Sequence, residues 1–362
     1  VRIFRKQIFL QFRKDGVNIE QSVNYHRIVI SFFIFFAIVY PNTISGKELS
    51  NIEKGLKYLY YIRKPNGKLP NVGDSDNGKV VPLNTYKKEP FQSVLNLGFM
   101  IFKRDNLRFL LDKIDTISIL VFGKKFVDLF HTLSDKKPKK QFKFFRKSGF
   151  FVFKSGWNPK DNYLFIHTNR FGPLNAPHSH SDLTSFVFSC QGKDLIIDSG
   201  TYSYNCPKRI RNKFKGAKAH NILTIDSKDQ AGSKRPFGWE NIPRSQARLE
   251  SNKNEIKIIC CHNAYSGILT QRKFQVKRDL GKIKIIDTIH PIGKRKDLNE
   301  KISIDLYFNL DKKIQFELKE SEILFENGVR MNFKSNYNFN LNIEKSVFSP
   351  YYGTKFENRK IH

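Results

Sequence analysis

The spacing of apolar and polar residues divides the chain into a helical part and a strand-rich part. In the stretch LSNIEKGLKYLYYIRK, apolar side chains recur at Ile52, Leu56 and Leu59, which is the spacing of one helix face. The stretches FQSVLNLGFMIFK and NLRFLLDKIDTISILVF follow a similar pattern. Residues 1–130 are therefore predicted to be helical, and the polar residues 131–145 are predicted to form a linker.

From residue 146 onward the helical spacing is replaced by short segments rich in β-branched and aromatic residues. Examples are GFFVFKSG, NYLFIHTN, NEIKIICCH and KIKIIDTI, and turn signals such as QGKD and NKNE separate them. Many short strands with close turns are typical of antiparallel sheets. The predicted fold class is therefore α+β, with helices followed by an antiparallel β-sandwich over residues 146–362.

Composition narrows the function classes without naming one. The formal net charge is +31, which favours acidic partners, but no zinc finger, RNP-like motif or basic zipper accompanies it. A nucleic-acid-binding protein is thus an alternative that only the charge supports. The most apolar run, Ile28–Tyr40, is thirteen residues long. It is shorter than the roughly 20 residues of a membrane span, so we predict a buried helix and no stable membrane insertion.

The strand-rich part contains histidines and aspartates in a suggestive order. The stretch APHSHSDLTSF contains His178, His180 and Asp182, which would share one face if the segment were extended. Asp198 ends the apolar run DLIID, and His220 precedes the run NILTID. Strand ends could bring imidazole and carboxylate groups together as metal ligands. The alternative is that they are surface or turn-capping residues.

The helical part contains two further polar clusters. The stretch DGVNIEQSVNYHR places Asn24, Tyr25 and His26 at the start of the apolar helix. A tyrosine beside a histidine suits acid–base chemistry, although the same residues also suit an ordinary polar helix start. Asp74 and Asp76, in GDSDNG, are a carboxylate pair of the kind that glycoside hydrolases use. Their closeness within one glycine-rich loop favours a structural turn.

The motifs taken together, in their order along the chain, resemble the heparinase II/III-like polysaccharide lyases. The matching stretches are DGVNIEQSVNYH, LPNVGDSDNG, HSHSDLTSF, LIIDSGTYSYN and RNKFKGAKAHNILTID. The resemblance runs from about residue 7 to at least residue 230, and it is shared with related alginate lyases. It implies an incomplete (α/α) toroid of helices followed by an antiparallel β-sandwich.

The resemblance also implies roles for individual residues. Tyr25 matches the family's catalytic tyrosine, and His178 matches the catalytic histidine that faces it across the cleft. The implied ligands of a structural zinc ion are His180, Asp198 and His220. The implied substrate contacts are Asn24, His26, Tyr202, Tyr204 and Arg211. By the same resemblance, Asp182 is a neighbour of the zinc ligands and not a ligand itself. His26 is expected to support the helix that carries Tyr25.

The implied activity is β-elimination at a uronic acid residue of an acidic polysaccharide, in a periplasmic or secreted bacterial protein. The family's toroid supplies an Asn or His well upstream of the tyrosine. Because Tyr25 lies near the start of this sequence, we expect the chain to be the C-terminal portion of a longer member, with activity impaired by the truncation. The alternative is a non-catalytic carbohydrate-binding or degenerate member of a surface-polysaccharide pathway.

Overall fold

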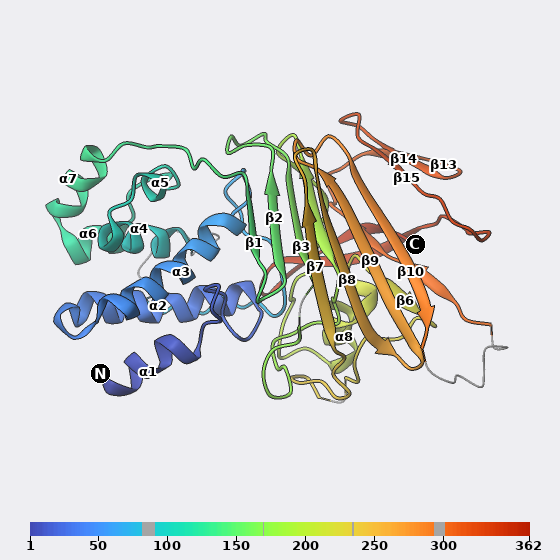
Figure 1. The fold of residues 1–362 in the computed structure, drawn as a ribbon, viewed down its shortest axis with the longest axis horizontal. Coiled ribbons are helices and arrows are strands. Elements are labelled where there is room, and N and C mark those ends of the chain that lie inside the picture. Colours follow the sequence, from blue (N-terminus) through green and yellow to red (C-terminus); the bar gives the residue numbers. More distant parts are fainter. Residues whose placement is uncertain (82–90, 169, 234, 293–300) are drawn as a thin grey trace.

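The computed structural model of the protein describes residues 1–81, 91–168, 170–233, 235–292 and 301–362, and it has a helical layer on one side of stacked sheets (Figure 1). Within these residues, none of the helices combines the length and apolar character that crossing a bilayer requires. The helices are α1 (Arg2–Leu10), α2 (Val23–Val39), η1 (Pro41–Thr43), α3 (Gly46–Ile62), α4 (Phe91–Phe102), α5 (Asp105–Arg108), α6 (Thr116–Phe122), α7 (Lys124–Thr132), α8 (Lys208–Lys215) and η2 (Ala217–Ala219).

The strands form two large antiparallel sheets and two small ones. The main sheet contains, in spatial order, β1 (Phe142–Phe145), β2 (Phe150–Lys154), β3 (Tyr163–His167), β4 (Phe186–Cys190), β5 (Lys193–Ile196), β12 (Phe308–Leu310), β17 (Thr354–Ile361) and β16 (Ile343–Tyr351). The second sheet contains β10 (Ile283–Pro291), β9 (Ile268–Lys277), β8 (Glu255–Tyr265) and β7 (Ser245–Ser251). The small sheets pair β11 (Ile304–Leu306) with β6 (Leu223–Ile225), and join β13 (Phe316–Lys319), β14 (Glu322–Phe325) and β15 (Arg330–Asn332).

The residues of strand β2 show how the main sheet lies between two other layers, the helices on one face and the second sheet on the other. The side chains of β2 alternate between the two faces of the sheet. Phe150 and Val152 belong to the core shared with the helices, while Phe151 and Phe153 belong to the core shared with the second sheet. Every residue of β2 is therefore buried. The predicted antiparallel β-sandwich is confirmed, with the helical layer covering the outer face of its main sheet (Figure 1).

The segment between the helices and the first strand is shorter than the predicted linker, 131–145. Helix α7 ends at Thr132, and β1 already begins at Phe142. The stretch FKFF pairs with β2 in a register that places Phe142 opposite Phe153. These phenylalanines gain more from packing at the sheet edge than from a solvated linker. The polar connection is reduced to residues 133–141.

The apolar run Ile28–Tyr40 forms most of α2, as predicted. Ile30 and Ile34 are fully buried in the helical core, whereas Phe32 and Val39 are largely exposed. The helix therefore packs against α3 and α4 on one side and leaves an apolar face open on another.

Candidate active site and metal site

The start of α2 places Tyr25 beside a loop from the helical layer. Ser22 caps the helix, because its Oγ accepts a hydrogen bond from the Tyr25 backbone N–H at 3.1 Å. The same hydroxyl donates to the backbone oxygen of Asp74 at 2.6 Å. One serine thus determines where the helix begins and ties its first turn to the loop GDSDNG.

This loop lies directly against the segment that contains His178. The backbone N–H of Asp74 donates to the backbone oxygen of His178 at 2.9 Å. Gly73 has a positive φ of 64°, and a Cβ at this position would lie 2.6 Å from the same oxygen of His178. Only glycine adopts this backbone conformation without strain and leaves room for the neighbouring segment.

Tyr25 and His178 are in direct ring contact. Their ring centroids are 3.7 Å apart and the rings are inclined by 21°, which is a stacked arrangement. The Tyr25 hydroxyl donates to Asp76 at 2.9 Å, and His178 Nδ1 lies 3.4 Å from Asp74 Oδ2. The sequence predicted that the two residues face each other across a cleft. The structure corrects this, because two carboxylates of one loop hold the rings together and leave no space for a sugar between them.

Tyr25 is protonated at neutral pH. Burial raises the pKa of its phenol most strongly, and the negative charge of Asp76 raises it further. A hydrogen bond from Tyr204, whose hydroxyl lies 3.3 Å away, acts in the opposite direction without reversing the increase in pKa. The phenol therefore keeps its proton at neutral pH and is a weaker acid than an exposed tyrosine.

Asp74 is the central acceptor of the site, a role that the sequence did not predict. Its carboxylate is fully buried and contacts His178, His180 Nε2 at 3.0 Å, and Arg211. Burial alone would raise the pKa of Asp74, but hydrogen bonds from both histidines and the charge of Arg211 outweigh burial and lower it. The one sequence feature that could have marked Asp74 as a site residue is its position within LPNVGDSDNG, a stretch that carried the family resemblance.

The three predicted zinc ligands lie together in the interior. Ligand atoms of His180, Asp198 and His220 are within 4.8 Å of one another, and His220 Nδ1 lies 2.7 Å from Asp198 Oδ2. His180 Nδ1 and His220 Nε2 are buried and have no hydrogen-bond partner among the described residues. Buried polar atoms are rarely left unpaired, and two imidazoles with one carboxylate are a donor set that zinc accepts. The residues therefore fit such an ion.

Burial and charge determine the protonation of this trio. Burial lowers the pKa of His180 to about 4, so its imidazole is neutral at neutral pH, as a ligand must be. Burial would also lower the pKa of His220, but the charge and hydrogen bond of Asp198 raise it. Asp198 in turn has a lowered pKa, because these contacts with His220 outweigh its burial.

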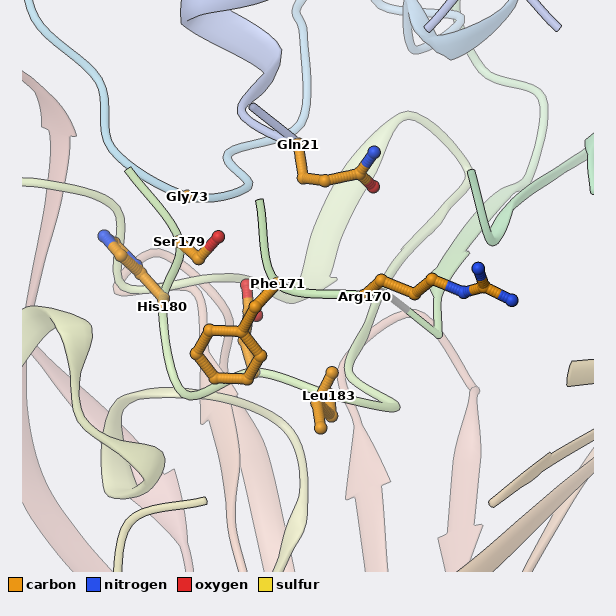
Figure 2. Close-up of a pocket in the computed structure, with 8 residues that line it drawn as sticks. Gln21, Gly73, Arg170, Phe171, Ser179, His180 and Leu183 are labelled. Carbon is orange, nitrogen blue, oxygen red and sulfur yellow. The ribbon is translucent and has the colours of Figure 1, made fainter. Parts of the chain in front are cut away.

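The segment 178–182 is not extended, so the condition under which His178, His180 and Asp182 would share one strand face is not met. This segment is a loop between β3 and β4, and Figure 2 shows Ser179 and His180 close to Gly73. Asp198 follows β5, as predicted, and His220 follows η2 just before β6. A strand cannot form at 178–182 because the segment makes local turns, with Ser179 N–H bonded to the backbone oxygen of Ala176.

Two of the predicted substrate contacts are interior residues. Arg211 is 1% exposed and forms an ion pair with Asp74, because the buried carboxylate needs a compensating cation. His26 is fully buried, where Nδ1 accepts from the Asn18 backbone N–H and Nε2 lies 2.9 Å from the backbone oxygen of Gly55. Both residues support the fold around the site and do not reach a ligand at its surface.

The other predicted contacts lie nearer the surface. Asn24 donates to Asp76 at 3.2 Å, and the Tyr204 hydroxyl contacts that of Tyr25. Tyr202 stacks against Phe214, with centroids 5.9 Å apart. The structure adds Phe237, which sequence reasoning missed and no local motif marked.

Phe237 is 38% exposed although it borders the site. Its ring lies edge-on to Tyr204, with centroids 5.1 Å apart, and edge-on to His178, with centroids 6.1 Å apart. The Tyr352 ring also contacts the Tyr204 ring, with centroids 5.1 Å apart and the rings tilted by 59°. An aromatic rim therefore borders the stacked Tyr25 and His178.

Comparison with known proteins identifies the family. Residues 137–361 match the family described as "Heparinase II/III-like, C-terminal", so the chain belongs to this family. It is 23% identical over 356 residues to a heparin-sulfate lyase of Bacteroides thetaiotaomicron, covering 93% of this chain and 45% of that protein. It is 23% identical over 320 residues to a heparin-sulfate lyase of Bacteroides stercoris, covering 86% of this chain and 41% of the relative. The chain thus spans less than half the length of these relatives.

Solved structures share the fold at low sequence identity. A heparinase III structure superposes with a TM-score of 0.77 and 19% identity, covering 100% of this chain and 52% of that one. A heparan sulfate lyase from Pedobacter heparinus gives a TM-score of 0.76 and 17% identity, with the same coverage of both chains. These likenesses confirm the arrangement of helical layer and antiparallel sheets.

Proposed function

We propose that the protein contributes the Tyr–His active site of a polysaccharide lyase that cleaves an acidic, uronic-acid-containing glycan by β-elimination. The observation that carries the proposal is the contact between Tyr25 and His178, with Asp76 and Asp74 behind them. The two relatives compared above are named heparin-sulfate lyases, which supports a sulfated glycosaminoglycan as the substrate class. The net charge of +31 favours such a polyanion. The helical layer is proposed to be part of an (α/α) toroid.

The proposed reaction needs two proton transfers, one to His178 and one from Tyr25. If His178 Nδ1–H donates to Asp74, Nε2 is the basic nitrogen and takes the proton from C5 of the uronate. The electrons of the broken C5–H bond form the C4–C5 double bond, and the C4–O bond to the leaving sugar breaks. The departing oxygen takes the phenolic proton of Tyr25, whose raised pKa keeps that proton in place until it is needed.

A zinc ion would be held by His180, Asp198 and His220, where it would crosslink the loops that carry the site. His180 lies only two residues after His178, so a metal bound to His180 would also restrain the segment that carries the proposed base. The residues of this chain therefore keep His178 beside Tyr25 through two contacts of Asp74. Its carboxylate binds His180, and its backbone N–H binds the backbone oxygen of His178.

The test is product formation by the protein from heparan sulfate, alginate and other uronate polymers, followed by ultraviolet absorbance of the unsaturated sugar. Tyr25→Phe is expected to lower the rate by about 100-fold or more, because it removes the proton donor and leaves the stack. Tyr40→Phe, at the exposed end of the same helix, is the control and should keep full activity. Glycan binding without product in the unaltered protein would contradict the lyase and support a carbohydrate-binding member.

A further inference from the structure

A groove in the helical layer lies outside the candidate active site and has no assigned role. It has a volume of about 600 Å³ and lies between the end of α1, the segment that follows α1, and the first half of α3. The residues that line it include neither Tyr25 and His178 nor any member of the metal trio. The groove is therefore a separate feature of the surface, and its lining indicates what it can bind.

Cations dominate the lining of this groove. Among the described residues, those that line it include no acidic side chain, and its cations are Arg13 and three groove lysines, Lys14, Lys47 and Lys54. The chain contains 64 Lys and Arg against 33 Asp and Glu, so exposed lysines alone would not mark a site. A concave surface lined by one sign of charge does, because its low-dielectric walls focus the field and attract counter-ions.

The charges of the groove lysines are open to a ligand. Three acidic residues neighbour them in the sequence, but each is held elsewhere: Asp15 by Ser148, Glu48 by Arg5, and Glu53 by Lys57. Among the described residues, none of the groove lysines takes part in an ion pair. All three are exposed, so they can bind an anion without first breaking a contact.

Phe9 and Phe12 add an apolar wall to the groove. Phe9, in α1, is 49% exposed, whereas Phe12 is buried and its ring lies against Phe33 of α2, with centroids 5.7 Å apart. A sugar ring has an apolar face of C–H groups and bears its charged groups at the edge. An exposed aromatic ring beside cations therefore fits an acidic saccharide, whose face can lie on the ring while its anionic groups reach the lysines.

The first turn of α3 adds to the positive potential of the groove. Gly46 and Lys47 line the groove and begin this 17-residue helix. The aligned peptide dipoles of a helix give its amino end a partial positive charge, which favours anions. A Cβ at Gly46 would meet nothing within 4 Å, so the backbone is open to a ligand at this point.

Two arginines continue the positive charge from the groove toward the candidate active site. Burial lowers the pKa of Arg13 most strongly, and the nearby charge of Arg170 lowers it further. Arg170 lines the same pocket as His180, and Figure 2 shows its side chain extending away from that histidine. Just after Arg170, a Cβ at Gly172 would lie 3.0 Å from the backbone oxygen of Glu20, in the segment that precedes α2.

We propose that the groove is a second binding site for the acidic glycan, which holds one stretch of the sugar chain while another stretch lies at Tyr25 and His178. The groove lysines bind sulfate or carboxylate groups, and Phe9 contacts a sugar ring. The inference rests on the proposed function, which supplies the class of ligand. The groove contributes binding only, and a chain that occupies both sites is held more tightly than either site alone would hold it.

The experiment measures binding of a heparin dodecasaccharide to the 362-residue chain by calorimetry at about 0.15 M salt. Every chain also carries Tyr25→Phe, so that the probe is not cleaved. The groove variant combines Lys14→Gln, Lys47→Gln and Lys54→Gln. Because each exposed ion pair contributes modestly, loss of three is expected to weaken binding by roughly 3- to 100-fold.

The matched control removes the same charge from other surfaces. It combines Lys124→Gln, Lys125→Gln and Lys313→Gln, which are exposed residues of α7 and of the strand-rich part. This control should bind the dodecasaccharide nearly as tightly as the chain with Tyr25→Phe alone, because none of its lysines lines the groove.

A second pair of variants tests the apolar wall. Phe9→Ala is expected to weaken binding of the dodecasaccharide by a few-fold up to about tenfold. Phe32→Ala is its control, because Phe32 is 47% exposed on α2 but does not line the groove. It should leave the affinity unchanged.

The proposal is overturned if the groove variant binds as tightly as the lysine control, or if both weaken equally, since net charge alone would then account for the loss. It is also overturned if a single-stranded oligonucleotide of equal charge competes as well as the dodecasaccharide, which would make the groove a general polyanion site. Absence of product from the unaltered chain would contradict the lyase and leave this test intact, because binding is measured without turnover.

Discussion

The phenol of Tyr25 lies flat against the imidazole of His178, and each ring is held by a different carboxylate of one loop. This loop belongs to the helical part, and it joins a tyrosine from α2 to a histidine from the strand-rich part. In the proposed lyase, a substrate would reach the edges of the two rings on the side where Tyr204 and Phe237 border them. The relative position of the rings depends on the loop, which makes the loop the first place to test.

Replacing Asp76 with Asn should shift the alkaline side of the pH–activity profile to lower pH. The negative charge of Asp76 contributes to the raised pKa of Tyr25, so removing it favours the phenolate and lowers that pKa. The measurement is kcat/KM as a function of pH for the unaltered protein and for Asp76→Asn. Asp128→Asn, in α7, is the control for loss of one charge away from the site. An unchanged or upward-shifted profile would show that Asp76 does not control the phenol.

Gly73→Ala should impair both stability and activity. The new Cβ would adopt a positive φ and would lie 2.6 Å from the backbone oxygen of His178, so the histidine segment must move. We expect a loss of unfolding free energy of more than about 1 kcal/mol, together with reduced kcat.

Gly328→Ala separates the two causes of that loss. Gly328 also has a positive φ, of 80°, but nothing lies within 4 Å of its added Cβ. This control should lose stability through its backbone conformation alone and keep full activity. Equal activity in the two variants would contradict a role of the close approach at Gly73.

Phe237→Ala should raise KM for the glycan by a few-fold up to about tenfold, with little change in kcat. The exposed Phe237 ring borders the site and is available to lie against the apolar face of a sugar, an aromatic contact of about 0.5–1.5 kcal/mol. Phe356→Ala is the matched control, because Phe356 is also 38% exposed but lies on β17. A drop in kcat with unchanged KM would instead give Phe237 a role in positioning His178.

Stability should fall as the pH rises above about 10, and two buried tyrosines should account for part of the fall. Burial raises the pKa of Tyr58 and of Tyr163 well above its ordinary value. Below about pH 10 both the folded and unfolded chains keep these protons, so no stability is lost. Above it the unfolded chain releases protons that the folded chain retains. Each tyrosine then costs up to about 1.4 kcal/mol of unfolding free energy per pH unit.

Two phenylalanine substitutions test this dependence by denaturant unfolding between neutral pH and about pH 11. Tyr58→Phe should be close to neutral at pH 7, because the Tyr58 hydroxyl has no partner among the described residues, and it should reduce the alkaline loss. Tyr163→Phe should reduce that loss too, but should cost about 1 kcal/mol at pH 7, because its hydroxyl donates to the Ile62 backbone oxygen at 2.7 Å. An unchanged alkaline slope in both variants would contradict the assignment.

Local sequence was sufficient for the architecture because secondary structure depends on spacing within a few residues. The helical spacing of Ile52, Leu56 and Leu59 predicted α3, and the stretch GFFVFKSG predicted β2. At 178–182 the same reasoning offered only a condition, that alternate residues share a face if the segment is extended, and the chain makes turns there. There the side chains are placed by a partner from the helical part.

Asp74 shows what the sequence alone could not establish. As a member of GDSDNG it looks like a turn residue, and its partners His178, His180 and Arg211 lie 104, 106 and 137 residues further along the chain. No local pattern encodes such contacts, because they exist only when the helical layer packs on the sheet. The same packing buried Arg211 against Asp74, whereas His26 is buried within the helical part, against Asn18 and Gly55; the resemblance had placed both among the substrate contacts.

The sequence by itself determined the two-part architecture, the family, and the identity of the tyrosine and histidine that form the candidate site. Only the tertiary structure decided that the two rings touch, that Asp74 and Asp76 hold them, and that His180, Asp198 and His220 lie together in the interior. The physical reason is that hydrogen bonding and burial at this site depend on segments brought together across the interface of helices and sheet, where distance along the chain carries no information about contact.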